Sequence, residues 1–295
     1  MQTATQDRIQ NSPATDPRER LLAALPVTER RLTLNGVSTA VLEGGQGKPV
    51  VLLHGPATYG AIWMDVITAL AKTHQVIAPD LPGHGASAFF DSAPAPQRVI
   101  GWLDDLVECC CAQPPVLVGE ALGGAIAARF AAEGGRPLAA LVLVDAWGLA
   151  DFTPTQALGA ALQSFLQAPT GTTFEGLWSA CIFDLEGVRQ RLGERWQWIE
   201  AYCVAGMQLG GSGPLLAWLE HFGMHAMPDT LLARIRTPTR LIWGRHDPVT
   251  SVAVAETASG RFGWPLEVIE DAGDAPIIER PGIFVDALHR ALGAA

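Results

Sequence analysis

The amino-acid sequence predicts an α/β protein built on a mostly parallel sheet, with an N-terminal hairpin and an inserted helical cap. Short apolar runs alternate with helical patterns between residues 49 and 149. An Asn-Gly turn separates two strand-like runs before them, and a long stretch without any strand pattern interrupts the alternation after them. Strands that alternate with helices form parallel sheets with right-handed crossovers.

The N-terminal elements come before the parallel strands. Residues 1–19 are polar, and we expect a flexible leader there. Residues 20–25 have the pattern of a short helix, which ends before a proline. The runs at 31–34 and 37–42 flank Asn-Gly at 35–36, the strongest short-range signal for a β-hairpin.

The parallel strands are apolar throughout, which indicates that helices cover both faces of the sheet. Helical spacing predicts the covering helices between and after these runs. The expected strands lie at residues 49–54, 74–79, 115–119, 138–144, 240–243 and 266–269, and the expected helices at 62–71, 102–111, 125–132 and 283–292.

Residues 150–235 interrupt this alternation and show helical spacing with several tryptophans. A helical insertion of this kind covers the carboxyl ends of the strands, where ligands bind in open α/β sheets. We therefore expect a cap at 150–235 between two parts of one core, 20–149 and 236–295. Trp147, Trp178 and Trp218 are candidates for the pocket lining, although cap tryptophans also form the cap's own core.

The composition limits the kinds of binding partner that we expect. The net charge of −10 and the pI near 5.1 disfavour nucleic acid and anionic membranes, and no apolar run reaches the length of a membrane-spanning helix. We expect a small-molecule ligand or substrate, and the sequence leaves a homodimer open.

The cysteines and glycines give no sign of a metal or a cofactor. The five cysteines contain no C-x-x-C pair, and three are consecutive at 109–111. The glycines at 44–47 form a loop between strands rather than a phosphate-binding turn that opens a helix. With no apolar signal segment at the N-terminus, we predict a cytoplasmic protein that needs no cofactor.

Five motifs stand in register along the chain: VVLLHG at 50–55, DLPGHGAS at 80–87, VLVGEALGG at 116–124, LIWGRHD at 241–247 and APIIERP at 275–281. Together they resemble the α/β-hydrolase superfamily, in its capped branch that includes esterases and epoxide hydrolases. The resemblance implies the α/β-hydrolase fold over nearly the whole chain.

The same resemblance indicates a degenerate catalytic triad. The family's nucleophile elbow, G-x-S-x-G, aligns with residues 119–123 and places Ala121 where the serine belongs. The acid is retained as Asp247, but Asp274 stands at the position of the histidine. A methyl group cannot attack a carbonyl, so ordinary serine hydrolysis is not expected. None of the histidines elsewhere in the chain is expected within hydrogen-bond reach of this site.

The oxyanion hole departs from the family pattern as well. The resemblance assigns one donor to the N–H of Leu122 and the other to the loop after Gly55. That loop begins with Pro56, which has no N–H, so Ala57 is the alternative donor. Loss of such a donor costs about 10²–10³ in rate.

The remaining acids could carry a different chemistry. If Asp247 and Asp274 face each other, one carboxyl should hold a proton near neutral pH, with Glu120 as a third acid. Arg245 could instead neutralise the pair. Asp145 is interpreted as a turn or capping residue.

Three hypotheses for the function stay open at this point. The first is a cofactor-free, non-hydrolytic enzyme of lyase, isomerase or cyclase type that uses carboxylate acid–base chemistry on a small apolar metabolite. The second is an inactive, ligand-binding pseudo-hydrolase. The third is a hydrolase with an atypical or engineered triad.

Overall fold

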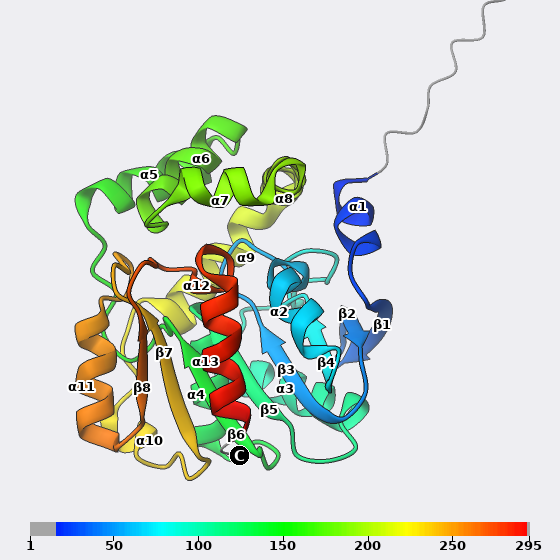
Figure 1. The fold of residues 1–295 in the computed structure, drawn as a ribbon, viewed down its shortest axis with the longest axis vertical. Coiled ribbons are helices and arrows are strands. Elements are labelled where there is room, and N and C mark those ends of the chain that lie inside the picture. The colour runs from blue at the N-terminus through cyan, green and yellow to red at the C-terminus, as the bar shows by residue number, and fades with distance from the viewer. Residues whose placement is uncertain (1–15, 294–295) are drawn as a thin grey trace, which may run out of the picture.

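The computed structural model describes residues 16–293 and centres on one eight-stranded sheet, in the order β1-β2-β4-β3-β5-β6-β7-β8 (Figure 1). The strands β3 to β8 are parallel, and β2 pairs antiparallel with both β1 and β4. The predicted, mostly parallel fold is confirmed. The strands are β1 (Thr28–Leu34), β2 (Val37–Gly44), β3 (Lys48–Leu53), β4 (His74–Pro79), β5 (Val116–Glu120), β6 (Ala140–Val144), β7 (Thr239–Gly244) and β8 (Leu266–Ile269).

The hairpin of β1 and β2 turns at Asn35 and Gly36, whose φ angles are 44° and 81°. Two successive positive φ angles match the right-handed twist of the flanking strands, and Asn-Gly tolerates them best. The predicted hairpin is therefore present, with β1 beginning three residues earlier than expected.

The central strands of the sheet are completely buried, because helices cover the sheet on both sides. Helices α3 and α4 pack together, as do α2 and α13. The sequence did not predict α11 and α12, which are short or weakly patterned. The covering helices are η1 (Gly60–Trp63), α2 (Met64–Leu70), α3 (Pro96–Cys110), α4 (Leu122–Glu133), α11 (Val252–Phe262), α12 (Pro276–Glu279) and α13 (Pro281–Gly293).

The chain between β6 and β7 is helical and lies above the carboxyl ends of the strands (Figure 1). We call residues 156–223 the inserted helices. They are α5 (Gln156–Gln167), α6 (Gly171–Cys181), α7 (Leu185–Leu192), α8 (Glu194–Gly206), η2 (Met207–Gly211), α9 (Ser212–Trp218) and η3 (Leu219–Gly223), and the short α10 (Asp229–Leu232) leads back to the sheet.

Helix α1 (Pro17–Ala23) connects the N-terminal part of the core to the inserted helices, because it packs against α8. Residues 17–19, expected to be part of the leader, belong to this helix. The remainder of that predicted leader, up to residue 15, lies outside the described residues.

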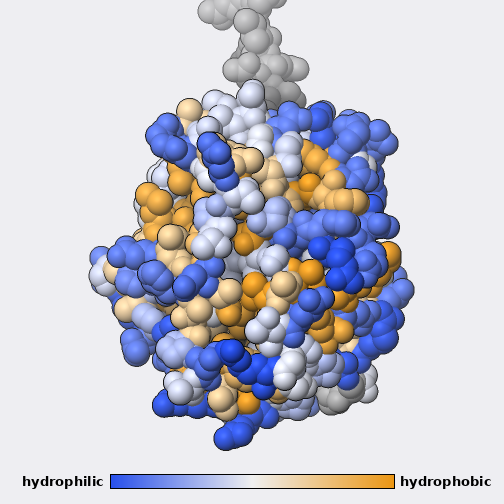
Figure 2. All heavy atoms as spheres, turned by 90° about the vertical axis from the view of Figure 1, so that its left-hand side faces the viewer, coloured by the Kyte–Doolittle hydropathy of each residue, from blue (hydrophilic) through white to orange (hydrophobic). Residues whose placement is uncertain are grey.

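No helix among residues 16–293 has the length and apolarity needed to cross a membrane. Figure 2 shows hydrophobic side chains interspersed with hydrophilic ones on the face that lies to the left in Figure 1.

Candidate functional site

The turn between β5 and α4 is sharply bent. Ala121, the one residue between these two elements, has φ 45° and ψ −110°, outside the regions that residues with side chains prefer. A Cβ on Gly119 would collide with the backbone oxygen of Gly123, and one on Gly123 with that of Leu53. The strained backbone and the two glycines together form a strand–turn–helix junction of the kind on which the family presents a nucleophile.

Asp247 follows β7 and is 5% exposed. Its Oδ1 accepts hydrogen bonds from the backbone N–H groups of Val249 (2.7 Å) and Thr250 (2.9 Å), while Oδ2 is buried without a partner among the described residues. Burial raises the pKa of Asp247 to about 7 despite these two N–H donors.

Asp145 is a member of the site that the sequence analysis missed. It follows β6 with φ 42°, is fully buried, and accepts the N–H of Gly244 through Oδ1 (2.8 Å). Its Oδ2, like Oδ2 of Asp247, is buried without a hydrogen-bond partner among the described residues. Burial and the charge of Asp247 raise the pKa of Asp145. Its position at the end of a parallel strand, on the same edge as Asp247, was the signal that could have found it.

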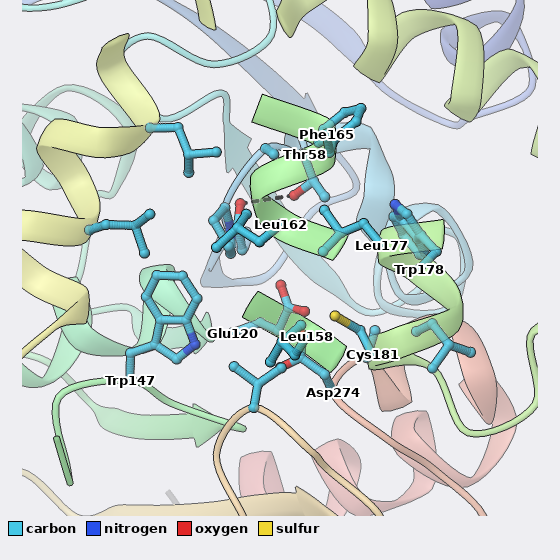
Figure 3. A pocket seen from close by; sticks show the side chains of 18 of the residues that line it. Thr58, Glu120, Trp147, Leu158, Leu162, Phe165, Leu177, Trp178, Cys181 and Asp274 are labelled. Atoms are coloured by element: carbon cyan, nitrogen blue, oxygen red, sulfur yellow. Dashed lines mark hydrogen bonds between the residues drawn. The ribbon is translucent and has the colours of Figure 1, made fainter. Parts of the chain in front are cut away.

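Glu120 and Asp274 complete a cluster of four carboxyl groups, and both line a cavity (Figure 3). Burial, and then the charge of Asp247, raises the pKa of Glu120 to about 8, while the N–H of Gly55 opposes the shift. Asp274 lines the cavity, and its Oδ1 has no hydrogen-bond partner among the described residues. The pKa of Asp274 is raised by burial and by the charge of Asp247.

The cavity lies between the carboxyl ends of the strands and the inserted helices and has a volume of about 110 Å³. Its wall is mainly apolar and includes Trp147 and Trp178, two of the three tryptophans expected there. Trp147 also brings an indole N–H that has no partner within the described chain. The other lining side chains are Phe152, Leu158, Leu162, Phe165, Phe174, Leu177, Cys181, Ile182, Leu215, Leu219, Val249 and Ala275.

Trp218 does not line this cavity, which corrects the expectation from the sequence. Its ring is fully buried against Phe90 and Phe222, and its indole N–H donates to the carbonyl oxygen of Pro82 (2.9 Å). A tryptophan packed between the inserted helices and the core shows the same helical spacing as one that faces a ligand, so the pattern could not distinguish them.

The loop that carries Asp274 is held by a buried glutamate. Glu279 accepts the N–H groups of Gly273 (2.7 Å) and Phe183 (2.8 Å), and the N–H of Asp274 donates to the carbonyl of Cys181 (3.1 Å). These bonds fix Asp274 relative to the end of α6, so its free oxygen has a defined direction.

Basic side chains stay away from the cavity. All seven histidines lie within the described residues, and none lines it. His54 is occupied by the backbone: Nδ1 donates to Gly55 and Nε2 accepts from Leu81, and burial lowers its pKa to about 4. His246 is exposed and stacks on Phe183, with ring centroids 4.2 Å apart.

Arg245 also points elsewhere, so it does not neutralise the acids as the alternative interpretation suggested. Its guanidinium lies in an exposed position and pairs with Glu270 (2.8 Å) and Glu256 (3.6 Å). The acid cluster therefore keeps its raised pKa values without a facing cation among residues 16–293.

The loop after β3 forms one wall of the cavity through Gly55, Pro56 and Ala57. Ala57 is in the left-handed region, with φ 55°. Leu122 is the first residue of α4, and a helix leaves its first N–H groups without an intrahelical partner. Two backbone donors, at Ala57 and Leu122, are thus the candidates for contact with a substrate oxygen.

A sequence profile of the alpha/beta hydrolase family matches residues 50–287, and the chain belongs to that family. The chain is 27% identical to a pimeloyl-[acyl-carrier protein] methyl ester esterase of Aeromonas hydrophila, over 87% of this chain and all of that one. It is 26% identical to a 2-hydroxy-6-oxo-6-(2'-aminophenyl)hexa-2,4-dienoic acid hydrolase of Metapseudomonas resinovorans, over 88% of this chain and 89% of that one.

A solved structure that resembles this one is the naproxen esterase of Bacillus subtilis. The similarity has a TM-score of 0.79 at 18% sequence identity and covers 94% of this chain and 95% of the esterase. At that identity the similarity establishes the shared fold. The chemistry has to be argued from the residues of this chain.

Proposed function

We propose that this protein is a cofactor-independent acid–base enzyme of lyase, isomerase or cyclase type, which transfers protons on a small, largely apolar substrate under a cap formed by residues 150–235. Asp274 and Glu120 are its catalytic residues, and Asp247 and Asp145 support them from behind. The observation that carries the proposal is a group of four neighbouring carboxyl groups, of which Glu120 and Asp274 line an apolar cavity with no basic side chain in its wall.

Coupling between the acids supplies both partners of a proton transfer. Each carboxyl group that ionises raises the pKa of its neighbours, so near neutral pH the cluster contains protonated and ionised members together. One carboxyl group at the cavity donates its proton to a carbonyl oxygen of the substrate. Its ionised neighbour takes a proton from the substrate carbon next to that carbonyl group. The reverse proton transfers then return both carboxyl groups to their starting states.

Ala121 favours chemistry without a covalent intermediate. Its methyl group holds the position of a nucleophile and cannot form an acyl-enzyme. The apolar wall and the free N–H of Trp147 suit a substrate with a carbonyl group on a hydrocarbon body.

A second candidate is hydrolysis by a water molecule that Asp274 activates. The activities after which two relatives are named, an esterase and a hydrolase, favour it. Its requirement is a base that touches the water; Asp274 lines the cavity, and its Oδ1 has no hydrogen-bond partner among the described residues.

The test compares the unmodified protein with Asp274→Asn and Glu120→Gln, and with Asp271→Asn as a matched control on the exposed part of the same loop. Deuterium exchange into phenylacetone in D₂O, followed by NMR, measures carbon deprotonation. Hydrolysis of p-nitrophenyl acetate is followed in parallel. We expect exchange that falls by about 10²-fold or more in the two site variants and stays unchanged in the control.

The other outcomes of this experiment would support one of the alternative functions. Ester hydrolysis that Asp274→Asn abolishes, without exchange, would establish the activated-water mechanism in place of the one proposed. Absence of both reactions, together with quenching of Trp147 and Trp178 fluorescence by an apolar ligand, would identify an inactive binding protein.

A further inference from the structure

A second cavity, of about 240 Å³, lies beside the one with the acids. The two cavities share Ala57, Thr58 and Leu215 in their walls, so they are adjacent across these three residues. The second cavity is lined by Tyr59 and His84 from the core and by α8 and the glycine-rich η2 from the inserted helices. No step of the proposed proton transfer uses it.

Tyr59, which lines the second cavity, has a hydroxyl group without a hydrogen-bond partner in the described part of the chain. Tyr59 is 1% exposed, and its Oη bonds to nothing among residues 16–293. Its ring is held edge-on against Tyr202, with centroids 4.5 Å apart. A buried hydroxyl that stays unpaired costs free energy, which a ligand oxygen at this place would recover.

His84 offers a complementary acceptor in the same wall. It is 6% exposed, and its Nδ1 lies 3.3 Å from the carbonyl oxygen of Pro82. Because a carbonyl oxygen can only accept, Nδ1 carries the hydrogen, and Nε2 of the neutral ring presents a lone pair. Burial and the nearby His54 lower the pKa of His84 to about 3, so the ring is neutral in the working pH range.

The charges next to this cavity do not favour an anionic ligand. The guanidinium of Arg18 lies over the ring of Tyr202, but it pairs with Asp80 (2.8 Å) and with Glu29 (2.8 Å). One positive charge is thus matched by two negative ones, and the local balance does not favour a carboxylate or a phosphate. An uncharged group that both accepts and donates, such as a hydroxyl, fits Tyr59 and His84 together.

We propose that the second cavity is a subsite for an uncharged hydroxyl group at the far end of the substrate, held by the Tyr59 hydroxyl and by Nε2 of His84. The apolar body of the same substrate occupies the first cavity. The assignment of the first cavity as the place of reaction rests on the proposed function, whereas the binding contacts of the subsite do not depend on turnover.

The test measures binding of ω-phenylalkanols with chains of four to eight carbons, and of their methyl ethers, by calorimetry and by fluorescence of Trp147 and Trp178. We expect one chain length to bind best as the alcohol, and its ether to bind more weakly because it cannot donate to His84. Tyr59→Phe should weaken that alcohol by about 2- to 10-fold and leave ethylbenzene, which fills the first cavity alone, unchanged.

Leu162→Ala is the matched control, because Leu162 lines the first cavity but not the second. It should weaken the alcohol and ethylbenzene alike. Tyr59→Phe deletes an unpaired oxygen, so its melting temperature should equal or exceed that of the unmodified protein, which shows that the variant is folded.

Equal affinity of alcohol and ether, or no effect of Tyr59→Phe on the alcohol, would overturn the subsite even if proton exchange is observed. Preference for the alcohol that depends on Tyr59 would establish the subsite even if no exchange is found. The two proposals therefore fail independently.

Discussion

At the scale of single residues, Ala121 has a backbone conformation that exposes a nucleophile in serine enzymes, with φ 45° and ψ −110°. Such conformations cost about 1–3 kcal/mol and persist where the surroundings determine them. The close packing of Gly119 and Gly123 does so here. Position 121 therefore has the backbone geometry that presents a nucleophilic side chain, although the residue there is alanine.

The first prediction follows from that geometry. The double variant Ala121→Ser, Asp274→His should gain hydrolysis of p-nitrophenyl acetate, because the serine would stand on the bent turn and the histidine beside Asp247. We expect a rate at least about 10²-fold above that of Ala121→Ser alone, which lacks the base. Equal rates for the single and double variants would mean that position 274 does not reach the turn.

The buried acid pair gives a second residue-scale prediction. In Asp145→Asn the amide oxygen keeps the N–H of Gly244, and the amide nitrogen can donate to Asp247, whose Oδ2 has no other partner. The variant should melt several degrees above the unmodified protein at pH 8, where carboxylate repulsion is largest, and by much less at pH 5. Thermal melts at both pH values, with Asp271→Asn as the exposed control, check this; a lower melting temperature at pH 8 would contradict it.

At the scale of elements, the inserted helices are interrupted at η2, where Gly210 has φ 109°. A side chain at such an angle is strained, whereas Gly213 in α9 has no positive φ and open space around its Cβ position. These two glycines, three residues apart, therefore respond differently to the same substitution.

We expect Gly210→Ala to lower the free energy of unfolding by about 1–2 kcal/mol and Gly213→Ala to raise it by up to about 1 kcal/mol. Urea unfolding followed by circular dichroism measures both. The interpretation of η2 as a glycine-dependent break would be wrong if Gly210→Ala were as stable as Gly213→Ala.

The elements that the sequence predicted best were those with a continuous pattern. The apolar runs of β3, β5 and β6 were located to within two residues, and the motifs around them also placed Glu120, Asp247 and Asp274 at one edge of the sheet. Helix α3 begins six residues before the expected start, because its first turn opens with Pro96 and polar residues. Asp145 and the true orientation of Trp218 depend on tertiary contacts that no local pattern contains.

At the scale of the whole molecule, the buried acids determine how stability depends on pH. The raised pKa of Asp247 (about 7) and Glu120 (about 8) lies above the value in an unfolded chain, about 4. The folded state therefore binds more protons than the unfolded state between these values, and stability decreases as the pH rises through that range.

The corresponding prediction is a melting temperature that falls steadily between pH 5 and pH 9. Calorimetry of the unmodified protein in buffers of equal ionic strength measures it, with Asp247→Asn and Glu120→Gln each expected to flatten the profile. A profile that rises over this range would show that the acids are ionised at little cost in the folded state.

Arg18 holds three parts of the molecule together. From α1 it reaches Asp80 after β4, Glu29 in β1 and the hydroxyl of Tyr202 in α8 (3.0 Å). Its guanidinium also lies over the Tyr202 ring, 5.5 Å from the centroid.

Arg18→Met should therefore lower the free energy of unfolding by about 3–5 kcal/mol, since it leaves Asp80 buried without its cation. Urea unfolding measures the change. Arg20→Met is the control, because Arg20 lies on the same helix and its guanidinium stands over the face of Trp198, 5.8 Å from the centroid, without a salt bridge among residues 16–293. A loss below about 1 kcal/mol would contradict the structural role given to Arg18.

The bond between Arg18 and Tyr202 spans 184 positions of the chain. During synthesis α1 leaves the ribosome long before α8, which emerges only after β1 to β6 have been made. Helix α1 can therefore complete its contact with α8 only late in synthesis, and this contact marks the point at which the inserted helices have joined the core.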